Sequence, residues 1–225
     1  MECATEERAP QRILSRVEPL RLCSPRGYLC RVAFTYRYGT PMSLFKLAGI
    51  RGLLDLDLDD GAARISYALR LEAEEWGALH YSHVEVPHGF DKRLFCGQIV
   101  DAGRLNYGTP RVCPECLIEN QVWWALWDLN YVCACPKHAA RLVNTCSSCG
   151  RQLRWNRPAP HLCKCGYDLR GIRCVRASDV LVGFTAKLYD AAVSVWKRLH
   201  AAGVTPDDSI VQPLSQETTR HYQVD

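Results

Sequence analysis

Apolar residues recur at intervals of three and four along the first half of the chain, a spacing that predicts amphipathic helices. The segment 24–38, SPRGYLCRVAFTYRY, has this pattern, with Ser24 as a suitable N-cap and Pro25 at the first helical position. The segment 40–50, TPMSLFKLAGI, repeats the same start signal. Two short helices joined by a tight connection resemble part of a helix-turn-helix, although any small helical domain contains such pairs.

The pattern of apolar positions changes farther along the chain. Segments 61–71 and 72–82 are predicted as two more short helices, whereas 84–110 alternates and contains turn residues, which indicates a linker with a short hairpin. The segment 178–203 is predicted as one long amphipathic helix. Its apolar stripe comprises Leu181, Phe184, Leu188, Ala192, Val195, Trp196 and Leu199.

Composition adds little to this picture, because 48% hydrophobic and 23% charged residues over 225 positions are typical of a soluble globular chain. There is no run of eighteen apolar residues, so we expect no membrane span. The N-terminal stretch is polar and lacks the apolar segment of a signal peptide, so we expect the protein to stay in the cytoplasm.

Charge is distributed unevenly. Residues 92–176 contain 13 Lys and Arg against 5 Asp and Glu, whereas the segments on either side are slightly acidic. This basic stretch fits a nearby polyanion and fits a basic solvated surface equally well. The candidate contacts to nucleic acid or a partner are Arg151, Arg154, Arg157, Lys164, Lys46 and Arg51.

Cysteine is the residue that changes the picture most. The chain has 13 cysteines, and eight of them lie between positions 113 and 165 in closely spaced pairs. In a chain without an export signal, clustered Cys-x-x-Cys pairs more often bind metal than form disulfides. The other cysteines within 1–112 and 166–225 have no partner at such a spacing and are expected to be ordinary thiols.

The spacing divides the ligands into two sets of four. The first set is Cys113, Cys116, Cys135 and His138, and the second is Cys146, Cys149, Cys163 and Cys165. Zinc favours four tetrahedral nitrogen and sulfur ligands, and a complete set leaves no position for a reacting water. We therefore expect two structural Zn²⁺ ions.

Two ligand assignments stay open. The doublet at 133–135 offers both Cys133 and Cys135, and we prefer Cys135 because Cys135-x-x-His138 mirrors the opening pair, which leaves Cys133 to pack as a small apolar residue. His161 is an alternative to one thiolate of the second set. Gly166 follows Cys165, as glycine often does where a turn needs positive φ.

Together these patterns predict a mostly α-helical fold with little β-structure. Residues 1–17 are expected to be a disordered lead-in, and 18–110 a helical, helix-turn-helix-like N-terminal domain with its linker. Tandem zinc ribbons follow at 111–145 and 146–176. A C-terminal amphipathic helix and a mobile tail occupy 177–225.

The cysteine-rich stretch resembles the TniQ family. That family has Cys-Pro-x-Cys-Leu, a Trp-rich helix, Cys-Pro-x-His, and Cys-x-x-Cys-Gly before a second ribbon, and RVCPECLIENQVWWALWDLNYVCACPKHAARLVNTCSSCGRQLRW contains them in this order. The resemblance extends over about residues 17–170 and departs from the family at the CAC doublet, at 84–110 and in the short C-terminus.

The resemblance implies a prokaryotic transposition protein that selects the target. Such proteins work beside a transposase and an AAA+ ATPase regulator. Some read an attachment site on DNA, and others connect a CRISPR RNA-guided effector complex to the ATPase. The compact length resembles the second kind, so we expect DNA and guide RNA nearby, while self-association into a homodimer stays open.

Four readings of function therefore compete. We expect a non-enzymatic adaptor, and the alternative is a sequence-specific DNA-binding protein that recognises a transposon attachment site. The second predicted helix contains Lys46 as its only charged side chain and is followed by Arg51. Base recognition normally uses arginine, asparagine or glutamine side chains near the start of the helix, so this helix is poorly suited to it. No paired acid and base, phosphate-binding glycine loop or open metal site indicates an enzyme. A generic zinc-ribbon module would leave the helical half unexplained.

Overall fold

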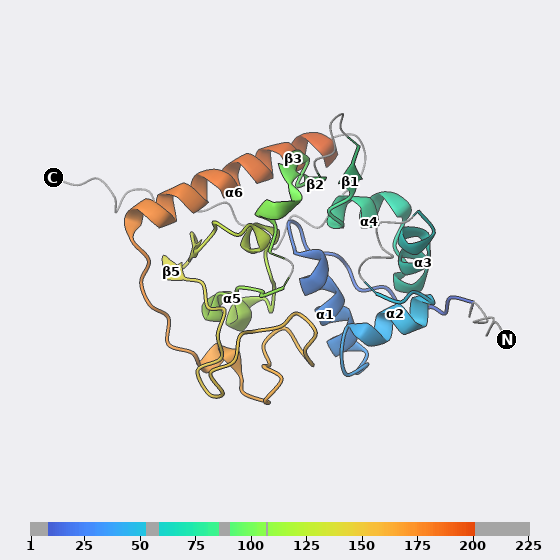
Figure 1. The fold of residues 1–225 in the computed structure, drawn as a ribbon, viewed down its shortest axis with the longest axis horizontal. Helices are drawn as coiled ribbons and strands as arrows, with labels where there is room; N and C mark the ends of the chain where they lie inside the picture. The colour runs from blue at the N-terminus through green and yellow to red at the C-terminus, as the bar shows by residue number, and fades with distance from the viewer. Residues whose placement is uncertain (1–8, 53–58, 86–90, 107, 201–225) are drawn as a thin grey trace.

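The computed structural model describes residues 9–52, 59–85, 91–106 and 108–200. Residues 53–58 and the predicted mobile tail after residue 200 are among those outside these ranges. Within them the fold is mostly α-helical with two small sheets, as the sequence predicts. Figure 1 shows the first four helices gathered on one side and the loops of the cysteine-rich part on the other.

The N-terminal helices are α1 (Pro25–Thr35), α2 (Met42–Ala48), α3 (Asp59–Leu69) and α4 (Ala73–Leu79). All four predicted helices are therefore present, each shorter or shifted by a few residues. Their apolar faces meet in one core, because every helix is too short to be stable without tertiary packing. The largest fully buried members of this core are Ile13, Tyr28, Leu29, Leu44, Phe45, Ile65, Leu69 and Trp76.

The helix boundaries follow only part of the start signals. Ser24 caps α1 through its side-chain oxygen, which accepts from the Gly27 N–H at 3.5 Å. The expected Thr40 cap is wrong: α2 begins at Met42 with no side-chain cap. Gly49 ends α2 in the left-handed conformation, at φ 72°, which only glycine adopts without strain.

The described part of the expected lead-in is ordered. Residues 1–8 lie outside the described ranges, but Ile13 is fully buried among the N-terminal helices. The Gln11 N–H donates to the Leu47 carbonyl at 2.8 Å, and the Ile13 N–H to the Ala68 carbonyl at 2.9 Å. The prediction of disorder is therefore wrong for residues 9–17, because an isoleucine in a polar stretch supplies an anchor.

The segment after α4 contains the expected hairpin as part of a three-stranded antiparallel sheet in the order β1–β2–β3. Its hairpin pairs Phe95 with Gln98 across a two-residue turn. Cys96 and Gly97 both have positive φ there, 47° and 79°, as a type I′ turn requires. The strands are β1 (His83–Val84), β2 (Lys92–Phe95) and β3 (Gln98–Asp101), followed by the short 3-10 helix η2 (Ala102–Arg104).

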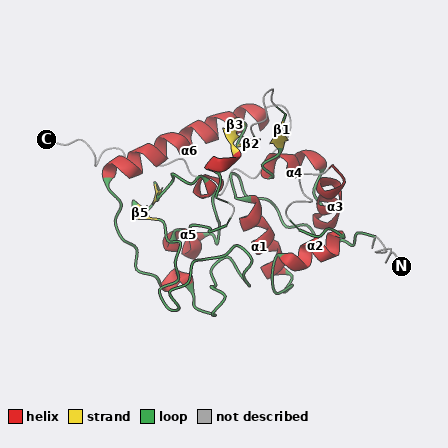
Figure 2. Cartoon of the chain, in the orientation of Figure 1, coloured by secondary structure: helices red, strands yellow, loops and turns green. Residues whose placement is uncertain are grey.

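The cysteine-rich part is built from very short elements joined by long loops, shown in green in Figure 2. Contrary to the helix of the family pattern, the tryptophan-rich stretch is a bridge followed by a 3-10 helix. The elements are α5 (Pro114–Glu119), η3 (Ala125–Asp128), β4 (Ala134–Cys135), β5 (Ala140–Arg141) and η4 (Leu169–Gly171).

The last element, α6 (Asp179–His200), is the predicted long helix and lies along one edge of the molecule in Figure 1. Among the side chains of α6 that the structure describes, Val182, Thr185 and Ala192 are buried. Ala192 belongs to the predicted stripe, and Leu181 and Leu188 of that stripe are partly buried against the core. Phe184 departs from the prediction, because it is 45% exposed. No helix within the described ranges is long and apolar enough to cross a membrane.

Helix α1 is the place where the helical half meets the cysteine-rich half. The Ser24 N–H donates to the Trp123 carbonyl at 2.7 Å, and the Ala125 N–H donates to the Leu22 carbonyl at 2.7 Å. A β-carbon at Gly27 would lie 2.7 Å from Cβ of Trp123, so a residue without a side chain is required at this contact. The two halves therefore share backbone hydrogen bonds and a close-packed contact.

Candidate metal centres

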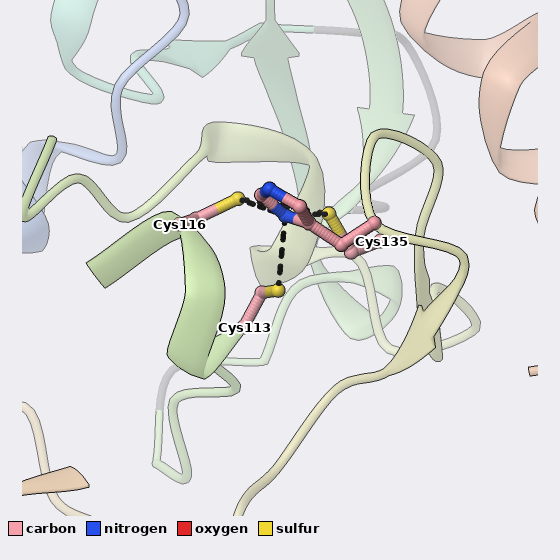
Figure 3. Close-up of side chains that lie close together, drawn as sticks. Cys113, Cys116 and Cys135 are labelled. Atoms are coloured by element: carbon pink, nitrogen blue, oxygen red, sulfur yellow. Dashed lines mark hydrogen bonds between the residues drawn. The ribbon is translucent and has the colours of Figure 1, made fainter. Parts of the chain in front are cut away.

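The first cluster is assembled by local structure at both ends of one loop. Cys113 caps α5 and Pro114 occupies its first position, so Cys116 follows in the first helical turn. Cys135 ends β4, and the tight turn after it brings back His138. Figure 3 shows the sulfurs of Cys113, Cys116 and Cys135 converging on one point.

The distances in this first cluster suit a tetrahedral ion. The Nδ1 atom of His138 lies 3.4 Å from the Cys113 Sγ, 3.3 Å from the Cys116 Sγ and 3.6 Å from the Cys135 Sγ. The Cys116 and Cys135 sulfurs are 3.6 Å apart. A zinc ion with bonds of about 2.3 Å to sulfur and about 2.0 Å to nitrogen separates two tetrahedral sulfurs by about 3.8 Å and a nitrogen from a sulfur by about 3.5 Å.

The chemistry of the first cluster also favours a cation. Cys113, Cys116 and Cys135 are at most 1% exposed. Hydrogen bonding to Cys113 and Cys135, together with burial, raises the pKa of Cys116 above its ordinary value. A bound divalent ion would stabilise the thiolates that burial and mutual repulsion disfavour.

The second cluster contains the four predicted cysteines in two facing turns. The Cys146 and Cys165 sulfurs are 3.8 Å apart, and those of Cys149 and Cys163 are 3.9 Å apart. In both clusters all four ligand atoms lie within 4.8 Å of one another. Glycines complete the turns at positive φ, Gly150 at 67° and the predicted Gly166 at 88°. Both sets therefore fit a metal ion whose four coordination positions are all filled by protein side chains.

The structure separates the two cysteines of the CAC doublet. Cys135 lies inside the first cluster, whereas Cys133 is exposed and its thiol faces the Tyr131 carbonyl at 3.7 Å. The expectation that Cys133 packs as an apolar residue is wrong, because its side chain is exposed just before β4 begins. His161 is outside the second cluster and packs edge-on against Phe34 at 5.3 Å.

A carboxylate beyond the four ligands orients the histidine. The Nε2–H of His138 donates to Glu119 Oε1 at 3.1 Å, and Lys137 Nζ donates to Glu119 Oε2 at 2.8 Å. Burial would raise the pKa of Glu119, but these two hydrogen bonds hold it below its ordinary value. The ionised carboxylate therefore fixes the tautomer that leaves His138 Nδ1 as the ligand atom.

Replacing Glu119 with glutamine is expected to weaken zinc binding at the first centre by about tenfold to a hundredfold, because His138 loses its charged partner. Competition with a chromophoric chelator measures this affinity. Glu115 supplies the control, since its Oε2 lies 3.9 Å from the same nitrogen and is too far to accept a hydrogen bond. Equal affinities for Glu119→Gln and Glu115→Gln would contradict the orienting role.

The residues predicted to contact nucleic acid occupy two separate places. Lys46 and Arg51 are exposed at and after the end of α2. Arg151, Arg154 and Lys164 are exposed on the loops of the second cluster, and they line one pocket with Arg157. Arg157 is only 1% exposed, so it lies beneath the surface that the other three residues occupy.

The buried position of Arg157 has a specific cause. Its guanidinium lies 4.0 Å from the centre of the Trp123 ring, and Nη2 donates to the Pro160 carbonyl at 2.9 Å. The Cys30 thiol of α1 donates to the Arg157 carbonyl at 3.6 Å. Stacking on an aromatic ring compensates part of the cost of burying an arginine, and charge counting along the sequence cannot reveal this.

Asp128 is a further residue that the sequence analysis did not select. Its carboxylate is 5% exposed and accepts hydrogen bonds from Ser24 Oγ at 2.6 Å and Tyr81 OH at 2.8 Å. Burial raises the pKa of Asp128, and the positive charge of Arg26 partly counters that shift. Its position next to Trp127, in the tryptophan-rich stretch that supports the family resemblance, is the one signal that could have identified it.

The comparisons with known proteins agree with this architecture. No curated protein matches the chain. A family model described as TniQ matches residues 14–142, which include the N-terminal helices, the small sheet and the whole first cluster. That match covers more than half of the chain, and the second cluster lies beyond it. The chain belongs to the TniQ family.

Proposed function

We propose that this protein is a non-enzymatic adaptor of transposon target selection, linking a target-bound complex to the AAA+ ATPase regulator that recruits the transposase. Membership of the TniQ family indicates a transposition protein that selects targets or binds DNA. The match over residues 14–142 is the observation that carries the proposal, because it unites the helical half and the first metal centre in one unit.

The metal centres support a scaffolding role. Each has four protein ligands of nitrogen or sulfur, a set that holds zinc without an open position for a substrate or water. The segments around them contain few hydrogen-bonded elements, so two structural Zn²⁺ ions would fix the shape of the loops and the surfaces that those loops present. Such an arrangement supplies surfaces for contact with other molecules rather than a catalytic pocket.

The shape of the helical half favours an adaptor over an attachment-site reader. Helix α2 has only seven residues, and Lys46 is its single charged side chain. Base reading in the major groove normally relies on several long polar side chains such as arginine, asparagine and glutamine. We propose that a CRISPR RNA-guided effector complex supplies the sequence specificity.

Co-sedimentation with the AAA+ regulator of the same transposon, loaded with ATP on DNA, tests this proposal. We expect the zinc-loaded protein to sediment with the ATPase filament at a few molecules per filament. In the control that contains naked DNA of the same sequence and no ATPase, the protein should remain in the supernatant. An absence of filament binding, combined with tight binding to one DNA sequence, would overturn the adaptor and establish the attachment-site reader.

A further inference from the structure

The second metal centre carries a basic pocket on its surface. Its volume is about 360 Å³, large enough for a phosphate group and its flanking atoms. Four of its lining residues are cationic and none is acidic. The lining comprises Arg151, Gln152, Leu153, Arg154, Arg157, Cys163 and Lys164.

One wall of this pocket is a buried guanidinium with spare donors. Arg157 is 1% exposed, and Nη2 donates to Pro160 while the ring of Trp123 lies against one face. Its Nε and Nη1 atoms are buried without any hydrogen-bond partner. Burial lowers the pKa of Arg157 to about 10, which still leaves the group charged near neutral pH. Unpaired buried donors of a charged group are costly, and an anion would relieve that cost.

The remaining cations of the pocket also lack acidic partners. Arg154 and Lys164 are exposed, and within the described ranges neither forms an ion pair with a carboxylate. Arg151 follows the ligand Cys149 by two positions, so its charge partly offsets the negative second centre. A zinc ion held by four thiolates carries two negative charges, and the four cationic side chains outweigh them.

We propose that this pocket binds a backbone phosphate of a nucleic acid, with the exposed cations Arg154 and Lys164 at its mouth and Arg157 as its buried charge. Guanidinium groups suit phosphate oxygens because they donate several hydrogen bonds in fixed geometry. The pocket suits a nucleic-acid strand better than a single free phosphate ion. Arg154 and Lys164 are exposed to solvent, so they can contact the neighbouring phosphates of a strand that extends beyond the pocket. This inference rests on the proposed function at one point, because it takes the nucleic acid of the transposition complex as the ligand of the pocket.

The test compares two double variants that remove the same charge. Arg154→Gln with Lys164→Gln alters the pocket, whereas Arg176→Gln with Lys187→Gln removes two exposed cations at and near α6. Fluorescence anisotropy with labelled duplex DNA and with single-stranded RNA is measured at several salt concentrations. We expect the pocket variant to bind about tenfold more weakly at low salt and to reduce the slope of log K against log salt by about one. The control variant should change both the affinity at low salt and the salt slope by less than the pocket variant does.

Three results would overturn the proposal that this pocket binds a backbone phosphate of a nucleic acid. The first is equal weakening by both double variants, which would show that only overall charge matters. The second is displacement of the nucleic acid by polyglutamate at matched charge concentration, which would assign the pocket to an acidic protein segment. The third is saturable binding of inorganic phosphate, lost in the pocket variant, with unchanged oligonucleotide affinity, which would assign it to a free anion.

The buried arginine needs a separate control because its removal can unfold the loop. Arg157→Lys keeps a positive charge but loses the fork of donors, and its zinc content reports whether the second centre is intact. With two zinc ions retained, we expect weaker oligonucleotide binding than in the wild type, and unchanged binding would exclude Arg157 from the site. Co-sedimentation with the ATPase filament tests the adaptor independently, so failure of the pocket and failure of the proposed function are distinguishable.

Discussion

Replacing Cys135 with serine is expected to leave the protein with one zinc ion per chain instead of two and to unfold the segment around the first centre. Structural zinc contributes roughly 10–16 kcal/mol of apparent binding free energy, which in such short segments is also folding free energy. The three sulfurs and one nitrogen of that centre are within 4.8 Å of one another, so losing one thiolate removes a quarter of the ligand set. Metal analysis of the purified protein and thermal unfolding measure both effects.

The matched control is Cys133→Ser, two positions away on an exposed side chain. We expect this variant to keep two zinc ions and a native unfolding temperature, since Cys133 lies outside the cluster. Two zinc ions in Cys135→Ser, or one in Cys133→Ser, would contradict the ligand assignment. The comparison separates metal loss from any general effect of replacing a cysteine.

Replacing Asp128 with alanine is expected to lower the free energy of unfolding by about 3–5 kcal/mol, because two buried hydroxyl groups lose a charged acceptor. Those hydroxyls belong to Ser24 and Tyr81, so the change acts on the N-terminus of α1 and on the chain after α4 together. Urea denaturation followed by circular dichroism measures the loss. Zinc content should stay at two ions, which distinguishes this effect from damage to a metal centre.

Asp168 provides the comparison for Asp128. Its side chain is 42% exposed, pairs with Arg170 and caps η4 by accepting from the Arg170 backbone N–H at 3.0 Å, contacts that together contribute about 1–2 kcal/mol. We expect Asp168→Ala to change stability by no more than that. Similar losses for the two alanine variants would show that Asp128 does not join the two halves of the molecule.

The parts of the fold that the sequence predicted are those governed by local patterns. Ser24 and Pro25 mark the start of α1, and the close spacing of Cys113 and Cys116 places both thiols at one helical turn. These signals act over a few residues and need no contact between distant segments, although the equivalent signal at Thr40 forms no cap on α2. The choice of Cys135 over Cys133 followed from the same local repetition and agrees with the cluster.

The features that the sequence did not predict depend on contacts between distant segments. A count of basic residues assigns Arg157 to the surface, yet stacking on Trp123 and a carbonyl acceptor hold it inside. Glu119 reads as an ordinary acidic residue at the end of α5, and only the fold brings it to His138. Helical periodicity put Phe184 on the buried stripe of α6, but periodicity alone cannot fix which side of a helix faces the core.

The bond between Ser24 and Asp128 also has a consequence for how the chain is made. The two residues are 104 positions apart, so at about 5–20 residues per second a ribosome needs roughly 5–20 seconds to add the second after the first. During that interval the surface of α1 that later packs on Trp123 has no partner. We therefore expect the newly made helical half to expose this surface until the metal-binding half emerges, and a lack of metal to lengthen that exposure.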